Sequence, residues 1–356
     1  MKRLLIEYQV FLSRVDEIEK FLIKIDRNAA IEKISSSISN LDTDIAGYLD
    51  FIRSLGSSPL SYNAIIISLY GCFENYIDKV LGVYLEILTE NKSAYEDLPD
   101  KLRDKYRSKF GEFLSNPQRF NNMDLDFTEE IAKYYELLQS NLSGTISKNI
   151  ALSHAGNLHI DEICSLMKHL GIRNPKEQII DSHIFKSYHI NNGMDEIEFV
   201  EKRTRKTEDF FLQLEQLILQ RNSVAHSWNV EDRITLRDIK NLIIPFIKLL
   251  CDCILRICVT NAYLLKSNNS MFHNEQPIAV FNKDIVCFNN QNVKIATGDY
   301  IIYASNEDIK VAKIQNIQFE NVDIYMVEET ESKDVGLKID NTIKKEDKIR
   351  MVISSI

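Results

Sequence analysis

Residues 65–85 read IIISLYGCFENYIDKVLGVYL, and this stretch indicates a helical fold. Its apolar side chains recur every three or four positions, which places them on one side of an α-helix. The members of this stripe are Ile66, Tyr70, Phe73, Ile77, Val80 and Tyr84. A helix with a continuous apolar side must bury that side against other elements, and the same period continues to about residue 266. The sequence therefore predicts a helical bundle.

Two long helices are expected in the second half of this bundle. One covers roughly residues 195–226, and the other covers roughly residues 236–265. Thr235 and Asp238 have the spacing of a capping box at the start of the second helix. We expect Pro245 to kink that helix near its first turns, because proline has no amide proton and its ring clashes with the preceding turn.

The first 55 residues predict a helical hairpin. Apolar residues with alternating spacings of three and four lie on both sides of the polar triplet 26–28. The first series is Leu4, Tyr8, Phe11, Val15, Ile18, Leu22 and Ile25, and the second is Ile31, Ile34, Ile38, Leu41, Ile45, Tyr48 and Ile52. Each apolar seam needs a partner. The hairpin therefore either packs on the helices that follow or forms a dimerisation arm, and the pattern leaves both open.

The period of the apolar residues changes from 3.6 to 2 beyond residue 268. Six or more short β-rich runs, separated by polar turns, predict a small barrel or sandwich over residues 272–356. Its many acidic residues give no cationic face for nucleic acid, so we expect a structural or protein-interaction role. The predicted fold class is mainly α, with a hairpin over 1–55, a helical bundle over 56–268 and this all-β domain.

Composition limits the class of protein. The 356 residues include 43 Lys and Arg against 52 Asp and Glu, which gives a formal charge of −9. No run approaches the roughly 20 apolar residues of a membrane span, and charges follow the start too closely for a secretory signal. We expect a cytoplasmic protein without membrane contact. The six cysteines lack metal-ligand spacings, so we expect no metal and no cofactor.

One arginine interrupts the apolar pattern of the helix that ends at residue 226. The apolar stripe of that helix leads through Leu214 and Leu217 to position 221, which is Arg221 instead of an apolar residue. A charged residue at a position where the helical pattern calls for an apolar one is expected mainly at functional sites. His226 follows about 7.5 Å further along the helix axis, at roughly 1.5 Å per residue. Because the arginine side chain can bridge that gap, one phosphate could contact both residues.

These residue types suit the cleavage of RNA. A histidine can take a proton from a ribose 2′-hydroxyl or give one to the leaving 5′-oxygen. An arginine matches the geometry of phosphate oxygens, and Asn222 can orient either group. No metal is needed for such a transphosphorylation. Because one His226 cannot serve both sides of the phosphorus, a symmetric dimer is expected. In the alternative, Arg221 caps helix carbonyls and His226 interacts with the helix dipole.

Three segments carry a resemblance to a known family. The stretch Arg221-Asn222-Ser223-Val224-Ala225-His226 resembles the R-x4-6-H motif of the HEPN superfamily. Residues 67–76 resemble its first helix, and residues 157–172 resemble a middle helix that closes with Leu170-Gly171-Ile172. The similarity is closest to the RiboL-PSP-HEPN type. It covers roughly residues 60–262, without the hairpin and the β domain.

The resemblance implies a metal-independent endoribonuclease that acts on RNA as a homodimer, with an antitoxin or a defence-system protein as a further partner. Toxin–antitoxin or antiphage systems are its expected setting. By this analogy Arg221 and His226 are catalytic, Asn222 supports them, and Glu74 faces the same site. Trp228 could stack on a base. The alternatives are a catalytically silent HEPN scaffold, which recruits a partner through the hairpin and the β domain, and small-ligand binding in the bundle.

Basic residues near the motif helix are candidate RNA contacts. They are Lys202, Arg203, Arg205 and Lys206, and a second basic series lies at 103–109. Each group could equally be a solvated face, and the negative net charge argues mildly against nucleic acid. The remaining histidines have no Arg or carboxylate at a catalytic spacing and are expected to be structural; they are His154, His159, His169, His183, His189 and His273.

Overall fold

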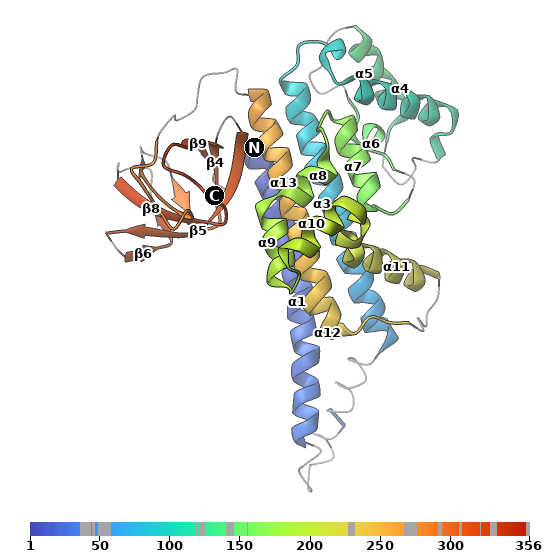
Figure 1. Ribbon diagram of the computed structural model, residues 1–356. Helices are drawn as coiled ribbons and strands as arrows, with labels where there is room; N and C mark the ends of the chain where they lie inside the picture. Colours follow the sequence, from blue (N-terminus) through green and yellow to red (C-terminus); the bar gives the residue numbers. More distant parts are fainter. Residues whose placement is uncertain are drawn as a thin grey trace.

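The computed structural model describes residues 1–35, 44, 47–48, 58–118, 120, 125–139, 146–154, 156–226, 232–266, 276–290, 294–305, 308–320, 322–327 and 333–353. In these ranges the chain forms a helical body with a smaller β domain beside it (Figure 1). The predicted fold class, mainly α with a small C-terminal all-β domain, is confirmed. No helix within these ranges combines the length and the apolar character that crossing a bilayer requires.

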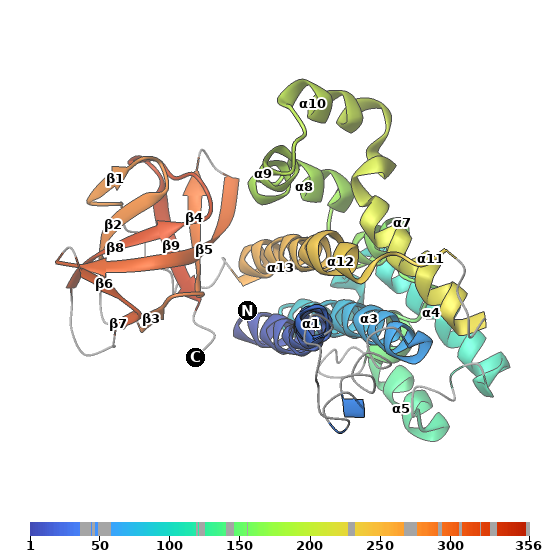
Figure 2. The same cartoon turned by 90° about the horizontal axis from the view of Figure 1, so that it is seen from below.

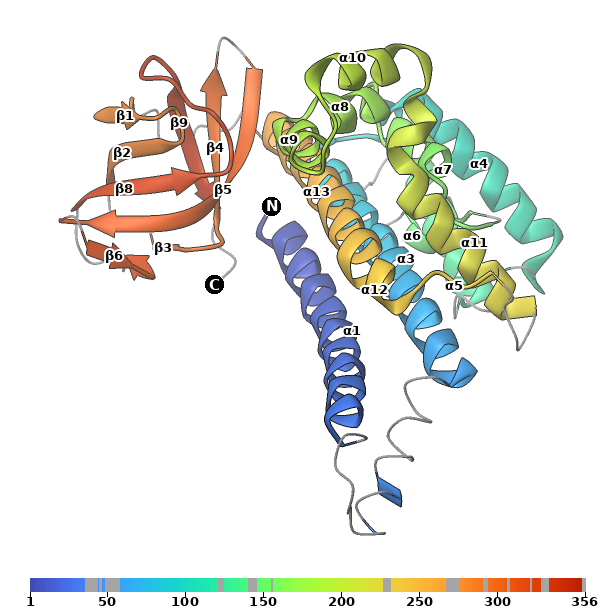
Figure 3. The same ribbon diagram turned by 60° about the horizontal axis from the view of Figure 1, so that its bottom comes forward.

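Three long helices form the centre of the helical body. They are α1 (Lys2–Ser35), α3 (Pro59–Glu90) and α13 (Ile244–Lys266). Each contacts the other two, and they run side by side (Figure 3). α3 begins where the Ser58 side chain accepts a hydrogen bond from the Leu60 amide and Pro59 occupies the first helical position. The stripe quoted above is buried, as predicted for residues 65–85.

The N-terminal helix differs from the expected hairpin. α1 continues through the polar triplet 26–28 to Ser35, so the predicted break at the triplet is wrong. Its apolar seam from Leu4 to Leu22 is buried in the same core as α3 and α13. Most of the second series of the predicted hairpin, from residue 36 onward, lies outside the described residues.

Shorter helices surround this centre. They are α4 (Asp100–Ser115), α5 (Phe127–Leu138), α6 (Lys148–Ala151), α7 (Ile160–His169), α8 (Pro175–Asp181), α9 (His183–Asn191), α10 (Glu196–Arg205) and α11 (Leu212–His226), with a 3-10 turn at Tyr95–Asp97. α7 ends before Gly171, whose positive φ of 85° is the left-handed conformation that glycine adopts freely.

The predicted helix over 195–226 is wrong, because three pieces replace it. α10 stops at Arg205, a 3-10 turn covers Thr207–Phe211, and α11 then begins. Lys206 separates the first two pieces, with φ −146° and ψ 58°. The run of polar residues at this point has no apolar side to bury, so nothing there favours one continuous helix. The basic residues 202–206 consequently belong to α10 and its end, instead of the start of the motif helix.

The last helix begins as predicted. The Thr235 hydroxyl accepts a hydrogen bond from the Asp238 amide at 3.0 Å. A short α12 (Leu236–Asp238) leads into one π-helical stretch, Ile239–Ile243, and then into α13. Pro245 has no amide proton to donate to the carbonyl of residue 241, four positions earlier. That residue lies within the π-helical stretch, whose turns are wider than those of an α-helix. The disturbance expected from Pro245 is therefore a π-helical turn.

The β domain is a curled antiparallel sheet (Figure 2). Its strands are β1 (Ala279–Phe281), β2 (Ile285–Asn290), β3 (Ile295–Ala296), β4 (Tyr300–Ser305), β5 (Asp308–Phe319), β6 (Val322–Ile324), β7 (Met326–Val327), β8 (Lys333–Ile339) and β9 (Lys348–Ile353). The main order is β1-β2-β8-β5-β4-β9, with β6 on β5 and a separate β3–β7 pair. Asn282 and Lys283, both with positive φ, turn the chain from β1 into β2.

A buried cation joins the β domain to α13. Arg256 forms ion pairs with Asp252 of its own helix and with Asp340 of the β domain. Tyr300 of β4 donates a hydrogen bond to Asp252 at 2.9 Å. Tyr300 and Ile302 are also part of the helical core. The two parts therefore share one interior.

Candidate active site

α11 brings Arg221 to the rim of the helical body. Leu214 and Leu217 are fully buried, whereas Arg221 is half-buried. Gln220 takes the inward position: it accepts a hydrogen bond from the Tyr62 hydroxyl at 2.6 Å and donates one to the Asp232 carbonyl at 2.8 Å. These bonds hold the end of α11 against the core through Gln220. Arg221, the next residue, therefore lies at the rim.

Neutral groups hold the Arg221 guanidinium. Its carbon lies 5.4 Å from the centre of the Tyr70 ring, and its Nη1 donates to the Asn222 Oδ1 at 3.2 Å. Within the described part of the chain no carboxylate lies within ion-pair distance of Arg221. Arg203, by contrast, makes a bidentate pair with Asp181. Among the described residues, no carboxylate therefore competes with an anion for the Arg221 guanidinium.

Tyr70 of α3 links several parts of the site. Its hydroxyl donates to the Glu74 Oε1 at 3.2 Å and accepts a hydrogen bond from the Leu158 amide at 3.0 Å. Burial raises the pKa of Tyr70 to about 12, so the hydroxyl keeps its proton at neutral pH. Glu74 was expected to face the site. In this structure it contacts Tyr70, and the Tyr70 ring in turn lies against Arg221.

The described residues between α6 and α7, which are 152–154 and 156–159 and are called the segment 152–159 here, lie along one side of the site. Asn157 donates from Nδ2 to the Asn222 Oδ1 at 2.9 Å. The same oxygen therefore accepts hydrogen bonds from both Asn157 and Arg221. Two residues further, His159 pairs with Glu215 of α11 at 2.7 Å. The segment is thus tied to the motif helix at two points.

His226 lies at the last position of α11 and is exposed. No hydrogen bond joins it to another described residue. Its imidazole is therefore open to a ligand or to another protein chain. Trp228, expected beside the motif, lies outside the described residues.

The basic residues 202–206 lie at the other end of the motif helix. α10 precedes the N-terminus of α11 (Figure 2), and the 15 residues of α11 span about 22 Å. Lys202 pairs with Glu198, and Arg203 pairs with Asp181. The prediction that these residues start the motif helix is wrong, because α10 ends at Arg205 before α11 begins. Acidic neighbours pair with two of these cations. The other two, Arg205 and Lys206, are exposed.

The basic series at 103–109 lies on α4 and faces a different hollow. Lys105 and Lys109 line a cavity of about 650 Å³ together with Lys168 and His169 of the α7 end. Burial lowers the pKa of Lys105 and of His169. None of the three motif residues lines this cavity.

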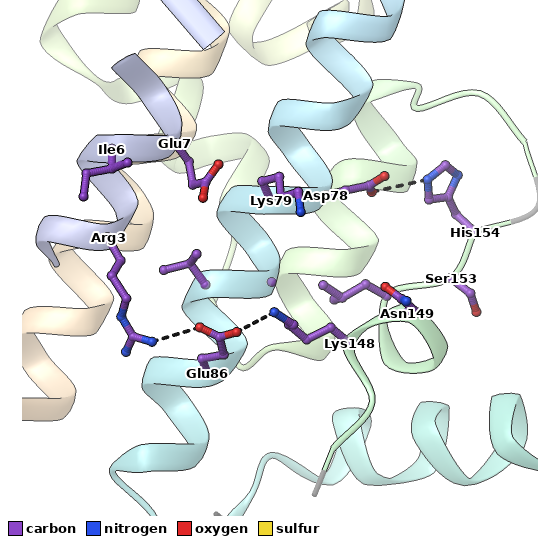
Figure 4. Close-up of a pocket in the computed structure, with 13 residues that line it drawn as sticks. Arg3, Ile6, Glu7, Asp78, Lys79, Glu86, Lys148, Asn149, Ser153 and His154 are labelled. Atoms are coloured by element: carbon purple, nitrogen blue, oxygen red, sulfur yellow. Dashed lines mark hydrogen bonds and ion pairs between the residues drawn. The ribbon is translucent and has the colours of Figure 1, made fainter. Parts of the chain in front are cut away.

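A larger cavity of about 780 Å³ lies between α1, α3 and the segment 148–154 (Figure 4). Ion pairs cross it: Glu86 pairs with Arg3 and with Lys148. On its far wall Asp78 and His154 point toward each other, 3.5 Å apart. Asp78 is two turns along α3 from Tyr70, so this cavity is a neighbour of the motif site and does not contain it.

The pairing of His154 with Asp78 was not predicted from the sequence, in which His154 was expected to be a structural residue. Its Nδ1 lies 2.8 Å from the Gly156 carbonyl, while Nε2 faces Asp78. Since the doubly protonated ring donates to both, the hydrogen bond to Asp78 raises the pKa of His154. His159 was missed in the same way. Their acidic partners are 76 and 56 residues away in the sequence, where no local spacing could reveal them.

Among the positions that the structure describes, no three His, Cys, Asp or Glu side chains form a cluster that could hold a metal ion. The polar groups that do converge are Tyr70, Asn157, Arg221 and Asn222, with His226 at the helix end. This donor set suits an anion such as a phosphodiester.

Comparison with known proteins gives one match. The model of the RiboL-PSP-HEPN family matches residues 10–260, which include α1 as well as the bundle. The similarity therefore begins earlier than the residue 60 expected from the motifs. Neither a curated protein nor a solved structure shows significant similarity to the chain. Since the family match covers more than half of the 356 residues and contains the motif from Arg221 to His226, this chain belongs to the RiboL-PSP-HEPN family.

Proposed function

We propose that this protein is a metal-independent endoribonuclease whose catalytic residues are Arg221 and His226. The observation that carries the proposal is the state of Arg221: its guanidinium rests on a tyrosine ring and an amide oxygen, without a carboxylate partner among the described residues. An exposed imidazole stands at the end of the same helix. Family membership adds support, because the HEPN nuclease motif has these two residue types at this spacing.

The proposed reaction is an internal transphosphorylation. A histidine removes the proton from the ribose 2′-hydroxyl, and the 2′-oxygen forms a bond to phosphorus. The bond from phosphorus to the 5′-oxygen breaks, and that oxygen takes a proton from a second histidine. Arg221 binds the phosphate oxygens and stabilises the charge that accumulates on them. The products carry a 2′,3′-cyclic phosphate and a free 5′-hydroxyl.

The second histidine is proposed to be His226 of another copy of the chain. Leu212 and Leu219 precede His226 by fourteen and seven positions, so the three residues lie on the same face of α11. Both leucines are more than half exposed, at 52% and 62%. Apolar side chains in line with a catalytic histidine suit contact with a second α11 across a two-fold axis.

Cleavage of single-stranded RNA in EDTA tests this proposal. We expect 2′,3′-cyclic phosphate ends, and no cleavage where the 2′-hydroxyl at the scissile position is removed. His226→Ala should lower the rate by at least about 10²-fold, and Arg221→Ala by about 10²–10³-fold. His183→Ala and Arg173→Ala, both at exposed positions, are the matched controls. Unchanged cleavage by the Arg221 and His226 variants would refute the assignment.

The biological setting proposed for this activity is a cytoplasmic toxin–antitoxin or antiphage system. Growth arrest on expression, relieved by His226→Ala, would support it. An antitoxin or a defence protein is then the expected partner.

A catalytically silent scaffold is the second candidate. One observation favours it: Ile278, just before β1, and Phe281, at its end, are exposed, and β1 is an edge strand of the sheet among the described residues. Such an edge can accept a strand from a partner protein. The cleavage assay separates the two candidates, since the scaffold would leave RNA intact at every enzyme concentration while retaining its fold.

A further inference from the structure

We infer that Tyr70 and Asn157 are positioning residues that fix the Arg221 guanidinium for phosphate binding. This inference rests on the proposed function for its catalytic consequence. The restraint on Arg221 itself is a property of the fold and can be measured separately. The two residues lie on different elements, α3 and the segment 152–159, and both approach Arg221 from within the same chain.

The Tyr70 ring restricts one side of the guanidinium. An arginine side chain has several rotatable bonds and loses much freedom when its end group is held. The ring centre lies 5.4 Å from the guanidinium carbon, and Tyr70 itself is only 2% exposed. A buried ring is a fixed support. The guanidinium that lies on it can present its remaining N–H groups only away from α3.

Asn157 supports the orientation of the Asn222 amide. An asparagine side chain can turn so that either its oxygen or its NH2 group faces a neighbour. Asn157 donates to the Asn222 Oδ1 at 2.9 Å, which favours the orientation with the oxygen toward Arg221. That oxygen is the atom that receives the Arg221 Nη1. In the other orientation the NH2 group would face the cation and repel it.

The two positioning residues also support each other. The Leu158 amide, next to Asn157 in the chain, donates to the Tyr70 hydroxyl at 3.0 Å. This bond holds the segment 152–159 against α3. Loss of the Tyr70 hydroxyl should therefore loosen Asn157 as well as the ring. We expect the loss of kcat on substituting both Tyr70 and Asn157 to be smaller than the two single losses combined, as in a shared hydrogen-bond network.

Kinetics of Asn157→Ala and Tyr70→Leu test the catalytic consequence. Both variants should lower kcat by about 10–100-fold, because a misplaced catalytic group costs that much, with KM changed less than about threefold. Tyr70→Phe, which keeps the ring, should lose less. Tyr62→Phe is the matched control: it removes a buried tyrosine hydroxyl that also joins α3 to α11, through Gln220. An equal loss of kcat in Tyr62→Phe would overturn the positioning role.

Chemical rescue gives a second readout that a general loss of stability would not imitate. Arg221→Ala should regain activity by about tenfold or more in millimolar guanidinium, since the ring and the amide oxygen still form the binding place. The double variants Arg221→Ala/Tyr70→Leu and Arg221→Ala/Asn157→Ala should gain less than about twofold. Equal rescue in the single and double variants would contradict the inference.

A measurement without RNA separates this inference from the proposed function. The order parameter of the Arg221 Nε–H bond, measured by 15N relaxation, should fall in Asn157→Ala and in Tyr70→Leu and stay unchanged in Tyr62→Phe. An unchanged value in all three variants would refute the positioning role. If the order parameter falls as expected but the wild-type protein leaves RNA intact, the restraint stands and the nuclease proposal fails.

Discussion

Arg221 shows what a sequence can and cannot say about a single residue. Its place on an otherwise apolar stripe predicted an unusual role, and in the structure the side chain is half-buried on the rim. The groups around it could not be predicted. Tyr70 and Asn157 precede it by 151 and 64 residues, and both looked like ordinary members of other helices. Contacts that depend on how three elements meet have no signature in local spacing.

Gln220 offers a test of how the end of α11 is held. Gln220→Ala should lower the free energy of unfolding by about 1–3 kcal/mol, because it removes the acceptor of the buried Tyr62 hydroxyl proton and the donor to the Asp232 carbonyl. Urea unfolding measures the change. Gln216→Ala, at an exposed position of the same helix, should stay within about 0.5 kcal/mol. Equal losses in the two variants would contradict this account.

At the scale of elements, the sequence predicted helices where apolar periodicity was strong and failed where it was weak. α3 and the start of the last helix at Thr235 agree with their patterns. The region 195–226 does not, because its polar middle has no buried side. The described residues of the segment 152–159 form no helix. Its position is fixed by hydrogen bonds to α3 and α11, which only the folded chain brings together.

The segment 152–159 should become less ordered as pH rises. The pKa of His154 in the folded protein is raised above 6.5, first by its hydrogen bond to Asp78, with contributions from the Gly156 carbonyl and Glu74. A raised histidine pKa stabilises the fold fully below the unfolded value, and that contribution is lost as pH rises through the folded value. Hydrogen exchange of the segment, corrected for intrinsic rates, should therefore accelerate above about pH 6.5.

The control for this pH effect is His154→Gln, which keeps a hydrogen-bonding side chain without a titration near neutrality. Its exchange in residues 152–159 should follow the intrinsic pH dependence alone. The same acceleration in His154→Gln as in the wild-type protein would exclude His154 as the cause.

At the scale of the whole molecule, the change of sequence period near residue 268 predicted a small β domain correctly. Its relation to the bundle was not predicted. Arg256 would be read from the sequence as an ordinary helix residue, yet it is 7% exposed and paired across the domain boundary with Asp340. The partner lies 84 residues away in the sequence, directly after β8. Only the assembled fold explains why a charge sits in this interior.

Arg256→Ala should be among the most destabilising single substitutions in this protein. It leaves Asp252 and Asp340, both largely buried, without their cation, which costs about 3–5 kcal/mol. Chemical unfolding followed by circular dichroism gives the change. Arg203→Ala removes an ion pair at the surface and should cost no more than about 1 kcal/mol. A small loss in Arg256→Ala would show that the two parts are joined mainly by apolar contacts.

The shared interior of α13 and β4 has a consequence for the history of the chain. A descendant that lost the β domain would expose the apolar side chains of α13 that this domain covers. A β domain inherited alone would expose the matching apolar side chains of β4. We therefore expect the helical body and the β domain to be inherited together, unless polar substitutions on both surfaces come first.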